Sequence, residues 1–301
     1  MSEEKFIPFS EGRHLSHSHV GNFKSCHTKW QLRYEHDIRP KETARGRSMG
    51  KVWTGAIEVA YDPEPTLADG LEFIIAEYLD KMNWAATQAE VDELENQEAI
   101  LRALLPGYIL RYPQPMQREI GYELPIPGSD RLWRGEIDGL MDDRLVEDKL
   151  LTPRFWNDAS ILQLKIDEQV TEYAYAGSLL GLPWEKSEYR VTMKPALQRR
   201  KVRQPETRRE FIDRVTADIA ARPDVYYRCY VLERTAEDLE AYESEKTATV
   251  KAMEEASRVA LAGTTSKNTG SCTDYGGCEY LGLCTQSRLD GYRSGASSAC
   301  Q

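Results

Sequence analysis

Apolar and polar positions repeat with two different periods along the chain. In the N-terminal third, apolar side chains recur every three or four residues, which predicts helices. From residue 117 the spacing becomes alternate, which is typical of strands. The predicted helices cover residues 22–36, 50–61, 67–87, 89–105, 160–181, 206–221 and 235–260, and Pro106-Gly107 is expected to end the fourth of them. The predicted strands cover residues 117–125, two segments within 131–151, 188–193 and 226–232.

This order of elements predicts one composite domain of α/β or α+β architecture. Helices come first, a central sheet with flanking helices follows, and a small, polar tail with cysteines ends the chain. We therefore divide the sequence into a helical part over 1–115, a core over 116–260 and a cysteine-bearing tail over 261–301.

The composition is that of a globular protein without a membrane segment. Of 301 residues, 41% are hydrophobic and 29% charged. No apolar run approaches the roughly 20 residues that span a bilayer, and the first residues are polar, unlike a signal peptide. We expect a cytoplasmic protein with no membrane partner.

The net charge of −10 means that any contact with nucleic acid must be local. Two segments are basic. Residues 190–209 contain eight Lys or Arg and one acid, and residues 39–51 contain five and one. Taken alone, both segments are better interpreted as solvated loops than as functional surfaces. If the chain cuts DNA, the candidates for contact with it are Arg199, Arg200, Lys201 and Arg203.

Two acidic residues are predicted to face each other across a hairpin. With Asp142-Asp143 as a two-residue turn, Asp138 lies opposite Glu147, at a Cβ separation of about 4.5–5.5 Å. Carboxylates this close repel each other, and a divalent cation removes the conflict. Hard oxygen ligands favour Mg²⁺ or Mn²⁺.

Further polar side chains follow this acidic pair. Lys149 leaves the same strand face as Glu147 and could steady an attacking water or charge on a phosphate. Gln169 and Tyr173 share one face of the next helix and could donate hydrogen bonds to phosphate or sugar. Each feature has a plain alternative: a solvated charged stripe for the strand, and a partly buried tyrosine beside an amide for the helix.

Together these motifs resemble the RecB-type branch of the PD-(D/E)XK nucleases. The motif order is Gly-x-Ile-Asp at Asp138, Glu-x-Lys at Glu147 and Lys149, then Gln-x-x-x-Tyr on a helix. Cysteines at 272, 278 and 284, with one far upstream at 26, resemble the iron–sulfur arrangement of the CRISPR-associated and AddB-like members. The resemblance covers about residues 16–284.

The resemblance implies a fold, two cofactors and an activity. The fold is a restriction-endonuclease-like core, a central mixed sheet flanked by helices. The activity is metal-dependent hydrolysis of DNA, as an exonuclease in recombination, repair or genome processing, on single strands or duplex ends, in the cytoplasm of a bacterium or of the host of a phage. The implied Mg²⁺ or Mn²⁺ ligands are Asp138, Glu147, the Asp148 carbonyl and Glu58, with Lys149, Gln169 and Tyr173 completing the catalytic set. The implied [4Fe–4S] ligands are Cys26, Cys272, Cys278 and Cys284.

One departure from the family pattern keeps alternatives open. The family has a Gly-x-x-x-His-x-x-x-Glu helix, but here Thr54 stands at the histidine position between Gly50 and Glu58. The number of metal ions is therefore open. A nuclease-inactive, iron–sulfur DNA-binding accessory protein is an alternative, as is a zinc-stapled structural protein. Structural zinc sites usually have two to four residues between cysteines, so gaps of five favour iron–sulfur. No P-loop motif is present, so any unwinding requires a helicase or recombination partner.

Overall fold

The chain forms two compact units. The computed structural model describes residues 14–40, 49–61, 66–113, 117–202, 204–261, 266–273, 277–286 and 289–294. The first unit combines residues up to 44 with 121–135 and 240–301, and the second combines 45–120 with 136–239. Strands β3 (Gln117–Pro125) and β4 (Leu132–Met141) each run from one unit into the other along the chain.

A mixed sheet forms the centre of the second unit. Its strand order is β4, β5 (Arg144–Leu151), β6 (Lys186–Met193) and β7 (Tyr227–Leu232). β5 is antiparallel to β4 and parallel to β6, and β6 is antiparallel to β7. β6 is buried along nearly its whole length, as expected where helices cover both faces of a sheet. The predicted α/β fold, a central mixed sheet flanked by helices, is confirmed.

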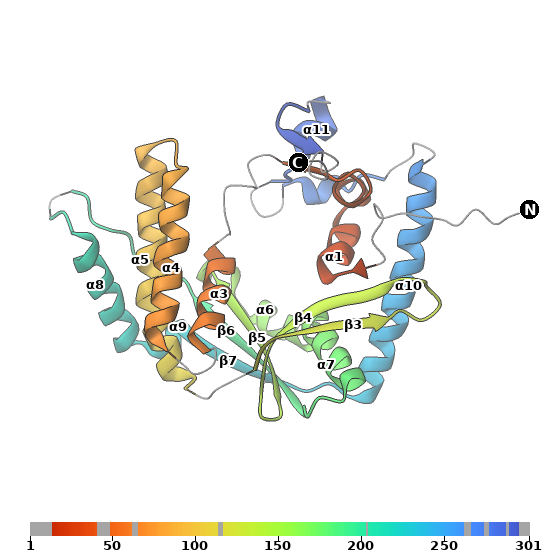
Figure 1. The fold of residues 1–301 in the computed structure, drawn as a ribbon, viewed down its shortest axis with the longest axis horizontal. Helices are drawn as coiled ribbons and strands as arrows, with labels where there is room; N and C mark the ends of the chain where they lie inside the picture. The colour runs from red at the N-terminus through yellow and green to blue at the C-terminus, as the bar shows by residue number, and fades with distance from the viewer. Residues whose placement is uncertain are drawn as a thin grey trace, which may run out of the picture. The chain divides into compact units, whose positions relative to one another are not determined.

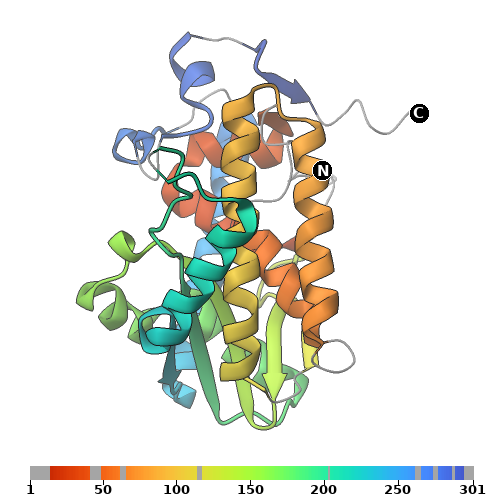
Figure 2. The same ribbon diagram turned by 90° about the vertical axis from the view of Figure 1, so that its left-hand side faces the viewer.

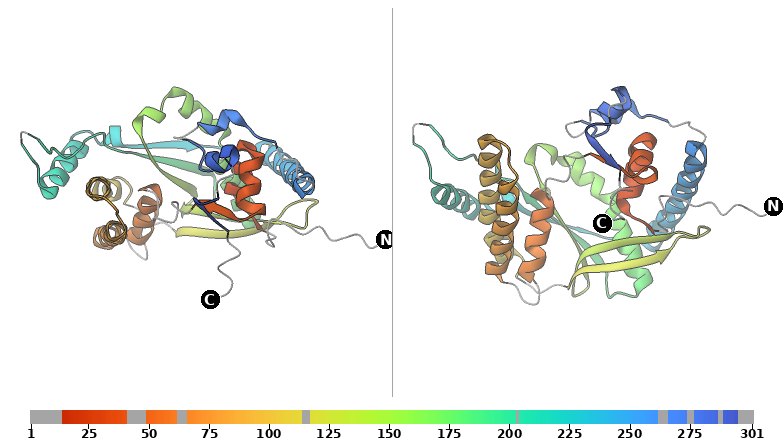
Figure 3. Two further views of the ribbon diagram at one scale, coloured as in Figure 1. Left: turned by 90° about the horizontal axis from the view of Figure 1, so that it is seen from above. Right: turned by 45° about the horizontal axis from the view of Figure 1, so that its top comes forward.

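Helices cover both faces of this sheet. Asp148 and Lys149 are consecutive in β5, so their side chains leave opposite faces. Asp148 accepts a hydrogen bond from Tyr108 of α5 (Gln88–Arg111), whereas Lys149 donates one to Gln169 of α7 (Glu168–Leu180). Helices α5 and α7 therefore lie on opposite faces, and Figure 3 shows α6 across the sheet from α3 and α4. The helices of this unit are α3 (Met49–Tyr61), α4 (Leu67–Asn83), α5 (Gln88–Arg111), α6 (Asp158–Gln163), α7 (Glu168–Leu180), α8 (Arg208–Ala221) and α9 (Pro223–Tyr226).

Helix α5 continues through Pro106, where the sequence predicted an end. The helix runs to Arg111, lies along α4 (Figure 1) and packs against α8 (Figure 2). Pro106 removes one backbone hydrogen bond, which ends a helix unless tertiary contacts compensate. Here Leu105 and Tyr108, on either side of the proline, are fully buried. Burial of both sides of the break holds the helix together, a contribution that local propensity does not contain.

A substitution tests how tightly α5 packs at this point. A Cβ atom on Gly107 would lie 2.4 Å from the hydroxyl oxygen of Tyr227, a buried side chain. That hydroxyl donates a 2.6 Å hydrogen bond to the carbonyl of Leu104, so the ring has little freedom to move. We expect Gly107→Ala to lower the free energy of unfolding by about 1–3 kcal/mol in urea titrations. The control is Gly21→Ala in another helix, where a Cβ meets nothing within 4 Å and alanine should stabilise by about 0.5–1 kcal/mol. Equal stability of Gly107→Ala and the parent would contradict this packing.

The first unit joins the N-terminal helices to α10 and the C-terminal tail. Gln31 donates a hydrogen bond to the carbonyl of Ala256, and Tyr280 donates one to the carbonyl of Ile38.

None of the helices in the described part of the chain is both long and apolar enough to span a membrane. The other elements of this unit are β1 (His14–Leu15), α1 (His17–Ser25), α2 (His27–Trp30), the π-helical turn η1 (Gln31–Glu35), β2 (Ile38–Pro40), α10 (Ala236–Leu261), η5 (Thr269–Cys272), α11 (Leu281–Gln286) and β8 (Tyr292–Ser294).

The single helix predicted over 22–36 was wrong. Helix α1 begins earlier, at His17, and ends at Ser25. Cys26 is extended, with φ −164° and ψ 118°, and a new helical segment starts after it. The cause is a contact from the tail, because the Asn268 side-chain amide donates a 2.9 Å hydrogen bond to the Ser25 carbonyl that a continuous helix would use. The break sets Cys26 apart from the helices that flank it.

Candidate active site

The structure brings together the five side chains proposed for catalysis. The hairpin register pairs Gly139 with Val146 and Leu140 with Leu145, which is the register that the turn at Asp142-Asp143 requires. Asp142 takes φ 50°, a left-handed conformation that Asp tolerates better than most residues. β4 and β5 thus carry the acidic residues and the lysine, and α7 supplies Gln169 and Tyr173.

Four of these side chains are joined by a continuous series of hydrogen bonds, and Glu147 is linked to the series through its ion pair with Lys149. The Lys149 ammonium donates to Gln169 Oε1 at 3.0 Å, and Gln169 Nε2 donates to the Tyr173 hydroxyl at 3.1 Å. That hydroxyl donates to Asp138 Oδ1 at 3.0 Å. Asp167 caps α7 by accepting from the Val170 amide, which interrupts the helix predicted over 160–181 and fixes where α7 starts. The Gln-x-x-x-Tyr face therefore links the lysine to the acidic pair, and its contact with DNA remains a prediction.

Glu147 carries an unsatisfied carboxylate. Its side chain is 2% exposed, and Lys149 forms an ion pair with it. Apart from that ammonium, which contacts Oε1, neither carboxylate oxygen has a hydrogen-bond partner among the described residues. Buried acceptors without donors are costly, so this carboxylate fits a cation ligand better than a structural role.

Burial perturbs both charged groups beside Glu147. It raises the pKa of Asp138, against the opposing effects of the Lys149 ammonium and of the Asp148 amide, which donates to Asp138 Oδ2 at 3.1 Å. Burial also lowers the pKa of Lys149, against the attraction of the Asp138 carboxylate. Perturbation of this kind is frequent at functional sites.

A second pair of acids lies near Asp138. Glu58 of α3 lies beside Glu119 of β3, and the pKa of Glu119 is raised by burial first and then by Glu58 and Asp138. Glu119 also takes φ 49°, which is unusual for this residue type. The sequence carried no motif for Glu119. Thr54, one turn before Glu58, donates its hydroxyl to the Gly50 carbonyl at 3.2 Å.

The donor set suits a hard divalent cation. In the described ranges, no three acidic, histidine or cysteine side chains surround one point as a finished metal site. The buried Glu147 carboxylate and the neighbouring carboxylates of Glu58 and Glu119 are nevertheless groups that Mg²⁺ or Mn²⁺ would satisfy. The Asp148 side chain is already bonded to Tyr108 and Arg118, so only its carbonyl is open to a metal.

The four cysteines proposed as cluster ligands line one cavity in the first unit. Its volume is about 310 Å³, and its wall includes Cys26, Cys272, Cys278 and Cys284. The pKa of Cys284 is raised by burial first and also by the other three thiols, in keeping with their shared cavity. Four thiols are the donor set of an iron–sulfur cluster, but among the described residues no three of them are close enough together to form a metal site in this structure.

Backbone and side-chain contacts fix the two sides of this cavity. The backbone amide of Asn268 donates to the Cys26 sulfur at 3.5 Å, and the backbone amide of Cys278 donates to the Cys272 carbonyl at 2.8 Å. Cys229 is exposed on β7 and does not line the cavity. Cys300 lies outside the described residues.

The basic residues proposed to contact DNA are paired with acids. Arg199 lies 3.0 Å from Glu95, Lys201 pairs with Asp92, and Arg200 lies 3.7 Å from Glu206. These partly exposed pairs are screened by solvent and therefore weak, so they can exchange for phosphate. Arg203 lies outside the described residues.

Comparison with known proteins places the chain in a family. Residues 14–285 match the PD-(D/E)XK nuclease superfamily. The chain has no significant sequence match among curated proteins.

Several solved structures are similar to the chain. A protein named as an exonuclease from Eubacterium rectale is 10% identical, with a TM-score of 0.49 over 89% of each chain. A phage-related exonuclease from Haemophilus somnus is 12% identical, with a TM-score of 0.35 over 70% of this chain and 95% of the other. An alkaline exonuclease from Laribacter hongkongensis is 15% identical, with a TM-score of 0.32 over 71% of this chain and 97% of the other.

Proposed function

Because the chain belongs to the PD-(D/E)XK nuclease superfamily, we propose that it is a metal-dependent deoxyribonuclease that degrades DNA as an exonuclease. The observation that carries the proposal is the meeting of Asp138, Glu147 and Lys149, in which the buried Glu147 carboxylate is paired with the Lys149 ammonium and has no other polar partner among the described residues. The nuclease would act in recombination, repair or genome processing. A helicase or recombination partner would supply any unwinding of the DNA.

The side chains divide the work of phosphodiester hydrolysis. Asp138 and Glu147 would hold Mg²⁺ or Mn²⁺, with the Asp148 carbonyl and Glu58 as further ligands. The bound cation supplies an activated water and a Lewis acid for the phosphate. Lys149, held by Gln169, would place its ammonium beside the phosphate and stabilise negative charge as it develops there. Tyr173 holds Asp138 through its hydroxyl and so keeps the carboxylate in place.

A substrate of matched sequence but different topology tests the exonuclease assignment. With Mg²⁺ or Mn²⁺, we expect labelled linear DNA to be degraded from its ends and a covalently closed circle of the same sequence to survive. Cleavage of the circle would make the protein an endonuclease. Binding of both substrates without any cleavage would favour the nuclease-inactive accessory protein.

We also place the chain in the RecB-like, iron–sulfur branch of the superfamily. In support, the four cysteines of that pattern line one cavity. A [4Fe–4S] cluster there would be held by Cys26 from the 1–115 part and by Cys272, Cys278 and Cys284 from the 261–301 tail. The nuclease core would occupy 116–260. Zinc at this cavity is the alternative, and elemental analysis of protein purified without oxygen separates the two.

The 199–201 segment should follow the DNA backbone. Changing Arg199, Arg200 and Lys201 together to Gln should weaken binding to all sequences alike and should reduce the slope of log K against log[salt] by about one for each cation removed. Fluorescence anisotropy at several salt concentrations measures both quantities. The matched control is Arg222→Gln, which breaks a similar surface pair with Asp218. An unchanged affinity and salt slope in the triple variant would show that this segment does not contact DNA.

A further inference from the structure

The middle residue of the Glu-x-Lys motif is itself a buried carboxylate. Asp148 lies between Glu147 and Lys149 in β5, and its side chain leaves the opposite face of the strand. That side chain is 1% exposed. Val146, which shares this face, is fully buried. An apolar residue would satisfy such a position more cheaply, because a buried charge is costly unless it is paired and hydrogen-bonded.

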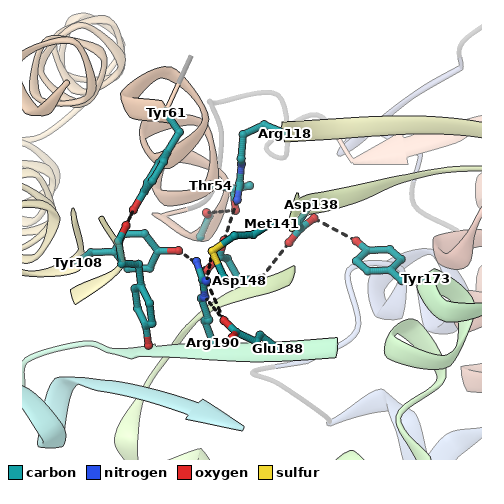
Figure 4. A network of polar contacts seen from close by, with 12 residues as sticks. Thr54, Tyr61, Tyr108, Arg118, Asp138, Met141, Asp148, Tyr173, Glu188 and Arg190 are labelled. Carbon is teal, nitrogen blue, oxygen red and sulfur yellow. Dashed lines mark hydrogen bonds and ion pairs between the residues drawn. The ribbon is translucent and has the colours of Figure 1, made fainter. Parts of the chain in front are cut away.

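Two side chains from other elements hold this carboxylate. The Tyr108 hydroxyl of α5 donates to Asp148 Oδ1 at 2.5 Å, and Arg118 Nη1 of β3 donates to Oδ2 at 2.9 Å. Arg118 is 5% exposed, so the ion pair is dry. Figure 4 shows both donors pointing at Asp148 from different sides. Each oxygen is therefore anchored separately, which fixes the rotation of the carboxylate as well as its position.

The same residue touches the candidate metal site through its backbone. The Asp148 amide donates to Asp138 Oδ2 at 3.1 Å, while Tyr173 holds Oδ1 of the same carboxylate. The peptide groups on the two sides of Asp148 join it to Glu147 and to Lys149. A shift of the Asp148 side chain would therefore move the Asp138 ligand and both neighbours in β5.

A second buried cation, Arg190, lies beside the Asp148 carboxylate and one of its two donors, Tyr108. Arg190 of β6 donates to Glu188 Oε2 at 2.7 and 3.0 Å and lies over the Tyr112 ring at 4.2 Å. Figure 4 shows it beside Tyr108 and Asp148. The Arg190 charge also acts on Tyr108 and on the Asp148 carboxylate, but the hydrogen bonds to Asp148 among the described contacts come from Tyr108 and Arg118.

We propose that Tyr108 and Arg118 are positioning residues for catalysis: by clamping the Asp148 side chain, they set the Asp148 peptide that orients Asp138 for the metal. The proposal rests on the proposed function, because it concerns the metal site of that nuclease. Neither residue touches the metal or the DNA in this account. Residues that orient metal ligands from behind typically change metal affinity or activity by about 10–100-fold when they are replaced.

Removal of one hydroxyl tests the clamp. Tyr108→Phe should raise the Kd for Mn²⁺, measured by calorimetry on the whole protein, by about 10-fold or more. The matched control is Tyr227→Phe, which removes an equally buried hydroxyl that donates to the Leu104 carbonyl instead. If the two variants lose similar thermal stability but only Tyr108→Phe loses Mn²⁺ affinity, the positioning role holds. If Tyr108→Phe binds Mn²⁺ like the parent, or if both variants weaken Mn²⁺ binding equally, the clamp is overturned.

Arg118 provides an independent arm of the same experiment. Arg118→Met should weaken Mn²⁺ binding, and Arg118→Lys, which keeps the charge, should recover part of it. Equal loss in both variants together with a lowered melting temperature would show a purely structural arginine and overturn its positioning role. Failure of the proposed function would give a different result. In that case the parent protein would not bind Mn²⁺ at this site, and Glu147→Gln would give the same calorimetric result as the parent.

Discussion

Lys149→Ala is expected to lower the rate of DNA cleavage by about 10²–10³-fold while leaving the fold and DNA binding nearly intact. The ammonium lies against Glu147 and Gln169 at the edge of the buried site, where a charge acts on the phosphate with less screening than in water. Single-turnover cleavage of a labelled oligonucleotide measures the chemical step apart from binding.

Two further variants sharpen this expectation. Lys149→Arg keeps the charge but cannot reproduce the ammonium's geometry, so it should restore only part of the rate. Lys165→Ala removes an exposed lysine shortly before α7 and should leave the rate unchanged. Cleavage by Lys149→Ala at the parent rate would remove Lys149 from the catalytic set.

Cys26→Ser is expected to damage the fold as well as the chemistry. A cluster that joins Cys26 to Cys272 closes a loop of about 246 residues, and treated as a covalent link it restricts the unfolded chain by roughly 5–6 kcal/mol. Typical net stabilities are about 5–15 kcal/mol. The variant, purified without oxygen, should therefore lack brown colour and be digested rapidly by protease.

The matched control for this variant is Cys229→Ser, because Cys229 is exposed on β7 and does not line the cysteine cavity. It should keep both colour and protease resistance. A folded, fully active Cys26→Ser protein would show that the N-terminal helices are not tied to the tail through a cluster. Iron-free, zinc-containing parent protein would refute the cluster type.

The sequence predicts those parts of the fold that depend on local pattern. Alternation over residues 131–151 predicts the hairpin, and the register at Leu140 and Leu145 follows from a two-residue turn. Helix spacing places Gln169 and Tyr173 on one face, and the structure joins them by a hydrogen bond. The hairpin register and the shared helix face depend on residues only a few positions apart. The periodicity of a single sequence is therefore enough to predict them.

What the sequence does not predict depends on distant partners. The break at Cys26 and the continuation of α5 through Pro106 follow from contacts with residues far along the chain. The left-handed backbone of Glu119 has no local sequence signal. For Arg118 the sequence did contain a signal. In β3 it lies on the same face as the buried Tyr122, and an arginine on a buried face requires an acidic partner.

Metal-dependent cleavage at the Asp138–Glu147 site is measured by the rate at which end-labelled linear DNA is cut as free Mn²⁺ is raised from a chelated start, for the parent and for Glu147→Gln. We expect no cleavage by the parent in chelator and a rise to full rate as Mn²⁺ fills the Asp138–Glu147 site. Glu147→Gln should require far more Mn²⁺ or fail to cut at all, because it loses a charged oxygen ligand. Parent cleavage that persists undiminished in chelator, or identical Mn²⁺ curves for the two proteins, would contradict the account.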